Sequence, residues 1–335
     1  MDISAGVMIF AETAEGKLSS ITKELMGLGT RLAGKLEKGL SAVLLGAGTE
    51  PLATELVNLG ADAVYLADDA FLENYNPEQY ASVIEHVIQT AKPAILLMGQ
   101  TSRGADMAPR LAFKFRGALA MDCVELDADS ETGLLTHTRP VYGGIAMARA
   151  RSRAASLQVV TVRAKSQDPA EPADDREGEI IAVGERARGE YAGGMKFLRP
   201  VAVEADEVNL EEANIIVAGG RGVGSTENFK RFIEGFARIL GGVPGASRGA
   251  LDSDFAPANL QIGLTGKIVS PQLYVAIGIS GMVQHMTGCS SSKTIVGINT
   301  DPDASIFKYA HFGIVGDFEQ VVPALMQKCE ELLKN

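Results

Sequence analysis

The sequence predicts an α/β protein built from two parallel-sheet domains, and three observations lead to that fold class. Short apolar runs of strand length alternate with amphipathic segments of helix length, and the alternation begins again at Asn214. The chain of 335 residues is long enough for two domains with full cores. Strand–helix–strand connections of this kind are right-handed crossovers and give parallel sheets. We place the first domain at 1–195, a linker at 196–204 and a second, three-layer domain at 205–335.

In the first domain, apolar runs predict strands at Val7–Ala11, Ala42–Gly46, Ala63–Ala67 and Ala94–Gly99. Amphipathic segments predict helices at Lys17–Leu36, Leu52–Leu59 and Pro77–Ala91. The pattern then changes, because three further strands are predicted with no helix between them: Asp122–Leu126, Leu134–Thr138 and Leu157–Val162. We therefore expect the first domain to close with an antiparallel extension.

In the second domain the alternation of strand and helix returns. Apolar runs predict strands at Ile215–Ala218, Leu273–Ile277 and Thr294–Ile298. Helices are predicted at Glu227–Leu240 and at Phe318–Leu333. A second parallel α/β domain follows from this order of elements.

Composition and charge exclude several classes of protein. A net charge of −11 argues against nucleic-acid binding as the main function of the chain. The three cysteines are far apart and form no CxxC, so neither a disulfide framework nor a zinc site is predicted. The start of the chain has no basic region, and no apolar run approaches the roughly 18 residues of a membrane span. We expect a cytoplasmic protein without membrane insertion.

The stretch 261–285 combines a Gly-rich turn, an apolar strand and the start of a predicted helix. Gly278 ends the strand at a place where a Cβ would hinder close approach of a ligand. Ser280 is a good N-cap residue, so we predict a helix whose first turn opens on Ser280 and Gly281. The free N–H groups and helix dipole of such a turn favour an anion such as phosphate. A strand–turn–helix unit that binds nothing is the alternative.

A second Gly-rich stretch, Gly219–Phe229, follows a predicted strand and leads into a predicted helix. It is not the GxGxxG fingerprint, because its alternating glycines fall at 220, 222 and 224. We interpret it as a nonstandard phosphate-binding turn in which Arg221 pairs with the phosphate charge, and a structural glycine turn is the alternative. Ser247 and Arg248 follow a similar turn, where Arg248 is either a ligand-binding cation or a surface charge.

Polar residues also follow two later strands. Asn299 and Asp317 stand at strand ends and suit the ribose or adenine edges of a nucleotide, unless they only cap turns. Among the four histidines, only His285 lies in a stretch predicted to bind a ligand, and a packed histidine is the alternative there. No Ser/His/Asp triad, carboxylate pair or metal-ligand cluster is recognisable, so we predict neither hydrolytic nor metal chemistry.

Taken together, these motifs resemble those of the alpha subunits of electron transfer flavoproteins. The resemblance covers essentially the whole chain and is strongest from Asn214 to Leu325. Six blocks stand in the order and spacing of that family: GGRG with ENF, GASR, QIGLTGK, LYVAIGISGMVQH, SKTIVGINTDPDASIF and FGIVGDFEQVVPAL. In the first domain, Ser102–Leu111 and Met121–Cys123 resemble the family more loosely.

The resemblance implies an electron carrier rather than a classical enzyme. It implies a heterodimer with a beta subunit, in which the first domain is the scaffold of the subunit interface and the second binds FAD. AMP or a second FAD is expected in the beta subunit. Electrons would come from acyl-CoA dehydrogenases of fatty acid β-oxidation or from another flavoprotein donor. They would leave, through a flavin semiquinone, to a quinone-linked or other flavoprotein acceptor. The second domain is expected to swing as a unit about Gly193–Gly194.

The resemblance also implies which residues hold the FAD. Thr265 would lie beside flavin N5, and Arg248 and His285 near the ring, where these three tune its potential. Asn299 and Asp317 would lie toward the adenosine. The complete set of expected cofactor contacts is Arg221, Ser247, Arg248, Gln261, Ile262, Gly263, Leu264, Thr265, Ser280, Gly281, Met282, Val283, Gln284, His285, Asn299, Asp317 and Phe318.

Two departures from the family pattern stand out. Leu264 occupies a position where the family usually has a polar Gln, and Tyr142–Arg151 differs from the commoner Gly-Asn-Ala pattern. Three alternatives stay open beside the simple carrier. They are an electron-bifurcating subunit whose complex oxidises NADH, a nucleotide-dependent enzyme with His285 as acid/base, and a nucleotide-sensing binding module without redox turnover.

Overall fold

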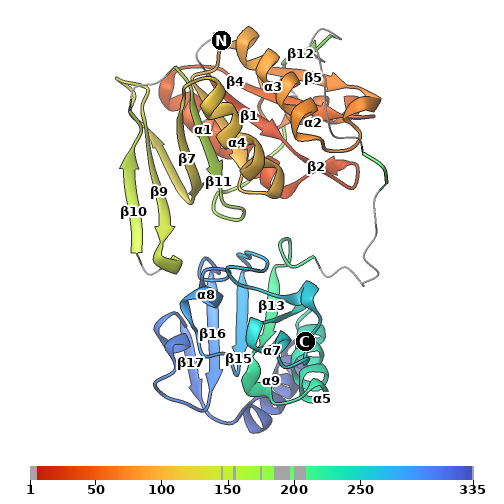
Figure 1. Cartoon of the computed structure of the whole chain (residues 1–335), viewed down its shortest axis with the longest axis vertical. Helices are drawn as coiled ribbons and strands as arrows, with labels where there is room; N and C mark the ends of the chain where they lie inside the picture. Colours follow the sequence, from red (N-terminus) through yellow and green to blue (C-terminus); the bar gives the residue numbers. More distant parts are fainter. Residues whose placement is uncertain are drawn as a thin grey trace. The chain divides into compact units, whose positions relative to one another are not determined.

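The computed structural model describes residues 6–144, 146–153, 156–173, 176–184, 197–199 and 209–333. The chain forms two compact units (Figure 1). The N-terminal unit comprises Met1–Pro140 and Met147–Pro200, and the C-terminal unit comprises Val141–Ala146 and Val201–Asn335. The proposed pivot, Gly193–Gly194, lies outside the described residues, as does most of the expected linker 196–204.

A seven-stranded sheet forms the centre of the N-terminal unit, with the strand order β12-β5-β4-β1-β6-β11-β7. Every pair in it is parallel. Its strands are β1 (Val7–Ala11), β4 (Leu40–Gly46), β5 (Ala63–Asp68), β6 (Ile95–Gly99), β7 (Ala118–Cys123), β11 (Gln158–Val162) and β12 (Glu179–Ala182). A two-stranded ribbon, β2 (Thr13–Ala14) and β3 (Lys17–Leu18), follows β1.

Four helices cover the two faces of this sheet (Figure 1). The apolar sides of α1 (Ser20–Leu36) and α2 (Glu50–Asn58) pack in one core cluster. Those of α3 (Pro77–Ala91) and α4 (Ser102–Lys114) pack in the other. The parallel-sheet α/β architecture predicted from the alternation is therefore confirmed for this unit, which has helices on both faces of the sheet.

The predicted antiparallel extension is only partly correct. A three-stranded sheet is present, in the order β10-β9-β8, made of β8 (Glu125–Ala128), β9 (Leu135–Val141) and β10 (Ala146–Arg151). However, β11 lies between β6 and β7 in the parallel sheet, and α4 connects β6 to β7. The reason is burial, because all five residues of β11 are buried, as in parallel strands covered on both faces.

The C-terminal unit contains a five-stranded parallel sheet with the order β14-β13-β15-β16-β17. Its strands are β13 (Ile215–Gly219), β14 (Val243–Ala246), β15 (Leu273–Ile277), β16 (Thr294–Asn299) and β17 (Phe312–Val315). One face packs against η5 (Phe229–Glu234), α6 (Gly235–Ile239) and α9 (Phe318–Leu333). The other packs against α8 (Val283–Met286) and η7 (Ser305–Lys308).

The predicted helix Glu227–Leu240 is helical but not one α-helix. It consists of the single turn α5 (Thr226–Asn228), the π-helical η5 and then α6. The short helical segments η4 (Arg221–Val223) and α7 (Arg248–Leu251) follow β13 and β14. Both segments therefore lie at the carboxyl ends of neighbouring strands.

The strand order identifies where a ligand would bind. From β13 the chain moves outward to β14 and then returns to β15 on the other side of β13. In open α/β sheets, ligands bind at the carboxyl ends of the strands at such a reversal. The segments that follow β13 and β15 therefore flank the expected crevice.

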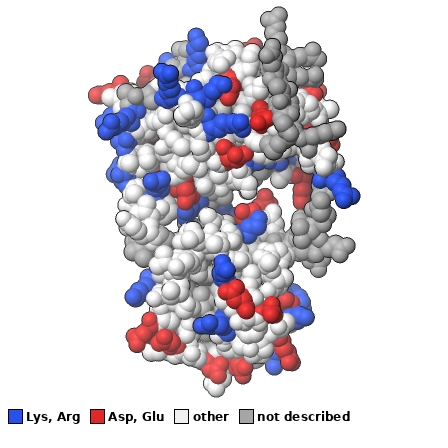
Figure 2. All heavy atoms as spheres, in the orientation of Figure 1, with Lys and Arg blue, Asp and Glu red and all other residues white. Residues whose placement is uncertain are grey.

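Acidic and basic side chains lie intermixed on the face that Figure 2 shows. Any local positive charge on that face therefore comes from individual arginine or lysine residues. Within the described part of the chain, no helix has both the length and the apolar character needed to cross a bilayer.

Candidate functional site

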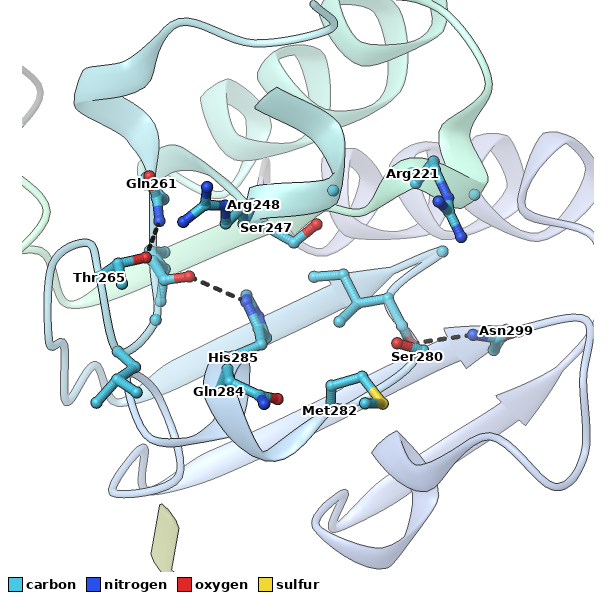
Figure 3. Close-up of a pocket in the computed structure, with 17 residues that line it drawn as sticks. Arg221, Ser247, Arg248, Gln261, Thr265, Ser280, Met282, Gln284, His285 and Asn299 are labelled. Carbon is cyan, nitrogen blue, oxygen red and sulfur yellow. Dashed lines mark hydrogen bonds between the residues drawn. The ribbon is translucent and has the colours of Figure 1, made fainter. Parts of the chain in front are cut away.

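A cavity of about 580 Å³ lies at the carboxyl edge of the five-stranded sheet (Figure 3). This volume is in the range of sites that hold cofactors and other small ligands. The lining residues follow β13, β14, β15 and β16, so the cavity occupies the crevice expected from the strand order. They are Arg221, Gly222, Ser247, Arg248, Gly249, Gln261, Ile262, Gly263, Leu264, Thr265, Gly278, Ile279, Ser280, Met282, Gln284, His285 and Asn299.

Most residues expected to contact a cofactor line this one cavity, and four of them do not. Gly281 packs its backbone against Ile306, and Val283 is exposed beside the cavity. Asp317 accepts a hydrogen bond from the Glu319 N–H at 2.9 Å and so caps the start of α9. Phe318 packs edge to face on Phe232 at 5.4 Å in the core. The proposed cofactor contacts of these four residues stay predictions.

Four lining residues were not predicted: Gly222, Gly249, Gly278 and Ile279. Their side chains carry no polar group that would mark them as ligands. Their position next to Arg221, Arg248 and Ser280 in the Gly-rich turns was the available signal.

Most N–H groups of the Gly-rich turn after β13 are hydrogen-bonded within the protein. Gly220 donates to the Ile277 carbonyl at 2.8 Å, Gly222 to the Gly278 carbonyl at 3.1 Å and Val223 to the Gly220 carbonyl at 3.2 Å. A Cβ on Gly278 would lie 2.9 Å from the carbonyl carbon of Gly222. The turn after β13 and the turn after β15 are therefore packed backbone to backbone. These hydrogen bonds support the structural reading of the glycines rather than a phosphate cradle of backbone amides.

The prediction that Ser280 caps a helix is wrong. Helix α8 begins at Val283, and Met282 occupies its N-cap without a side-chain hydrogen bond. The cause is tertiary, because Gly281 has a φ of 79° and the Ser280 carbonyl accepts from the Ile306 N–H at 3.0 Å. The segment before α8 is thereby held along η7.

Backbone donors nevertheless remain on this side of the cavity. Within the described part of the chain, the N–H groups of Ile279, Ser280 and Gln284 have no hydrogen-bond acceptor. All three residues line the cavity. The segment after β15 therefore offers amides to an anion, and by the same criterion so does the Arg221 N–H in the turn after β13.

Two guanidinium groups add positive charge at separate ends of the cavity. In Figure 3, Arg248 lies on the side of Gln261 and Thr265, and Arg221 lies toward Ser280 and Asn299. Arg248 Nε is 3.6 Å from Asp252 Oδ2, with side chains 68% and 66% exposed. Such an exposed ion pair is weak, so the Arg248 guanidinium can also bind an anionic or electron-rich ligand.

Thr265 presents a directed hydroxyl group. Its Oγ1 accepts a hydrogen bond from Gln261 Nε2 at 2.8 Å. Because the oxygen accepts in this contact, the hydroxyl proton is left to donate elsewhere. The loop therefore carries one donor suited to a lone pair on a bound ligand.

His285 is buried, and both of its ring nitrogens are engaged. Nδ1 lies 3.0 Å from the Ile262 carbonyl oxygen, and Nε2 lies 2.9 Å from the Tyr274 hydroxyl. A carbonyl only accepts, so Nδ1 carries the proton and the neutral ring accepts from Tyr274 at Nε2. Burial lowers the pKa of His285 to about 4. This geometry does not favour His285 as a general acid or base at neutral pH.

Metal chemistry has no visible site in the described residues. No group of three or more His, Cys, Asp or Glu side chains is placed there to hold an ion. Cys289, the thiol nearest the cavity, is buried in the core beneath His285, and burial raises its pKa to about 12. The polar groups that line the cavity are suited to binding a cofactor.

Comparisons with known proteins identify the family of the chain. The electron transfer flavoprotein domain model matches residues 7–187, and the electron transfer flavoprotein FAD-binding domain model matches residues 209–290. The second match contains the cavity except for Asn299.

Curated relatives match over nearly their whole length. The chain is 42% identical over 326 residues to the electron transfer flavoprotein subunit alpha of Thermoanaerobacterium thermosaccharolyticum, covering 97% of this chain and 98% of the relative. It is 39% identical over 331 residues to the corresponding subunit of Bacillus subtilis, covering 97% and 98%. It is also 39% identical over 332 residues to the protein FixB of Clostridium saccharobutylicum, covering 98% and 97%. The chain therefore belongs to the alpha subunits of the electron transfer flavoprotein family, and its C-terminal unit is a flavin-binding domain.

Proposed function

We propose that the cavity of the C-terminal unit binds FAD. We further propose that the chain, paired with a beta subunit, carries electrons from acyl-CoA dehydrogenases or other flavoprotein donors to a quinone-linked or other flavoprotein acceptor. The observation that carries this proposal is the convergence of two arginines, open backbone amides and a directed hydroxyl on one cavity at the strand reversal. The beta subunit would hold AMP or a second FAD.

The lining fits the chemistry of a flavin nucleotide. Arg221 and Ser280 lie at one end, where the guanidinium and the open Ser280 amide would hold the diphosphate. Thr265 and Arg248 lie at the other end and would face the ring. The bound flavin supplies the one-electron chemistry, and the protein supplies binding, orientation and electrostatics.

The charge that tunes the flavin would come from Arg248 rather than from His285. The Arg248 guanidinium is charged at any physiological pH and lines the cavity. His285 lines the same cavity as a neutral ring with both nitrogens occupied. His285 would therefore contribute the fixed dipole of its neutral ring and hold the backbone at Ile262, and it would add no positive charge.

Leu264 gives the site an apolar edge. Its side chain is 61% exposed and lines the cavity next to Thr265. A leucine cannot donate a hydrogen bond to the flavin, so this position contributes contact and exclusion of water only. As a consequence, polar contacts to the ring at this edge would come from neighbours such as Thr265 and Arg248.

A flavin count on the purified complex of alpha and beta subunits tests the proposal. We expect a yellow complex that releases FAD on denaturation, identified by mass. Arg221→Ala should weaken FAD binding about tenfold to a hundredfold, the loss expected for charge-assisted hydrogen bonds. Titration of the FAD-depleted complex with FAD measures this change.

Arg238→Ala is the matched control, because Arg238 is an exposed arginine on α6 outside the cavity. It should bind FAD like the unmodified complex. A colourless complex that takes up no flavin on reconstitution would overturn the proposal.

A further inference from the structure

Tyr274 lies on the central strand β15, beneath the cavity and outside its lining. Its side chain is fully buried, and its hydroxyl lies 2.9 Å from His285 Nε2. The Cys289 thiol also approaches this hydroxyl, and burial raises the pKa of Tyr274 well above its usual value. Tyr274 therefore stays protonated and donates to the imidazole.

His285 connects Tyr274 to the loop that carries Thr265. Its Nδ1–H donates to the Ile262 carbonyl at 3.0 Å, at the start of that loop. The Leu264 N–H donates to the Gln284 carbonyl at 2.7 Å, which joins the same loop to α8 a second time. One buried chain of contacts thus connects β15, α8 and the loop 261–265.

We propose that Tyr274 is a positioning residue of the flavin site, which acts through His285 to fix the loop of Thr265 against α8 and to hold the imidazole in its Nδ1–H form. Tyr274 does not itself line the cavity, so its effect on the flavin is indirect. The expected effect on FAD binding rests on the proposed function. The hydrogen bonds that link Tyr274, His285 and the Ile262 carbonyl do not depend on it.

A buried tyrosine needs no such arrangement for packing alone. Tyr80 in the N-terminal unit satisfies its hydroxyl with the Leu72 backbone carbonyl at 3.0 Å. Tyr274 instead uses a side chain whose other nitrogen reaches a ligand-binding loop. The two tyrosines therefore form a matched pair: the same buried hydroxyl group, with and without a link to the cavity.

The groups around the His285 imidazole allow a pH titration of His285 to report on its hydrogen bond with Tyr274. Tyr274 faces the imidazole from β15, the Cys289 thiol in the turn after α8 lies 3.7 Å from the His285 carbonyl oxygen, and Arg248 lines the cavity from α7. Burial raises the pKa of Cys289 to about 12, so the thiol stays neutral through the neutral pH range. Of these groups, His285 alone changes charge between pH 4 and 8.

The test compares Tyr274→Phe with Tyr80→Phe in the complex of alpha and beta subunits. Loss of the Tyr274 hydroxyl removes the donor that stabilises the neutral ring. We expect the His285 pKa to rise toward the ordinary histidine value. ¹⁵N NMR of the imidazole nitrogens measures this pKa. The variant His285→Gln assigns the His285 signal among the four histidines of the chain. Amide exchange in 261–265 should become faster, and FAD affinity should fall about tenfold.

Tyr80→Phe should change none of these three readouts. Unchanged His285 titration and unchanged amide exchange in Tyr274→Phe would overturn the proposal. The unmodified complex gives a second measurement that needs no variant, because an Nε2–H tautomer or a charged ring at pH 7 would also overturn it. If the complex binds no FAD, the proposed function fails, while the tautomer and exchange measurements still decide the role of Tyr274.

Discussion

At the scale of single residues, the structure separates two side chains that the sequence placed together. Arg248 and His285 were both expected to tune the flavin. Arg248 is exposed, charged and only weakly paired with Asp252. His285 is buried and neutral, with Tyr274 and the Ile262 carbonyl as its partners. Only the first of them can place a full positive charge beside a reduced ring.

We therefore expect Arg248→Ala to retain FAD and to lower its one-electron potential. A unit charge at about 4 Å and an effective dielectric of ~20 contributes roughly 4 kcal/mol. The Arg248 side chain is 68% exposed, so solvent screening reduces this effect to an expected fall of some tens of millivolts. Spectroelectrochemical titration measures the potential. Arg238→Ala serves as the control, and an unchanged potential in Arg248→Ala would refute the role of Arg248.

At the scale of elements, the two turns after β13 and β15 form one packed unit. Gly278 has a φ of 62°, and a Cβ there would lie 2.9 Å from the Gly222 carbonyl carbon. Gly224 has a φ of 78°, and a Cβ there would meet no atom of the described residues within 4 Å. Both glycines thus have a positive φ, but only Gly278 is closely approached by a neighbouring turn.

This pair gives a test of the packed turns. Gly224→Ala should cost about 1 kcal/mol of unfolding free energy, the strain of a side chain at positive φ, and leave FAD affinity unchanged. Gly278→Ala should cost more and weaken FAD binding at least tenfold, because the turn of Arg221 must move. Urea unfolding and FAD titration measure the two effects. Equal losses in both variants would show that the contact between the turns contributes nothing.

Element boundaries also show how far the sequence could be interpreted. The helices Pro77–Ala91 and Phe318–Leu333 and the strand Leu273–Ile277 begin and end where the patterns predicted. Strong periodicity or an uninterrupted apolar run determines these elements locally. The place of β11 within the sheet was not predicted, because strand order depends on contacts with β6 and β7 that lie far away in the sequence.

At the scale of the whole molecule, membership of the family leaves one question of function open. On the proposed function, a simple carrier would hold AMP in its beta subunit and an electron-bifurcating complex would hold a second FAD there. We expect the complex to contain one FAD and one AMP and to leave NADH unoxidised. Quantifying released nucleotides and following NADH absorbance with and without a dehydrogenase donor measures both properties. Two FADs with NADH oxidation would instead establish bifurcation.

The sequence by itself determined the two α/β units, the family and most of the residues that line the cavity. These follow from local periodicity and from motifs whose spacing is preserved along the chain. Only the tertiary structure decided what several of those residues do. Gly222 in the turn after β13 donates to the turn after β15, Ser280 does not cap α8, and burial keeps His285 neutral while both of its ring nitrogens are engaged. The physical reason is that hydrogen-bond partners and burial are set by segments that meet in space, and a linear pattern contains neither.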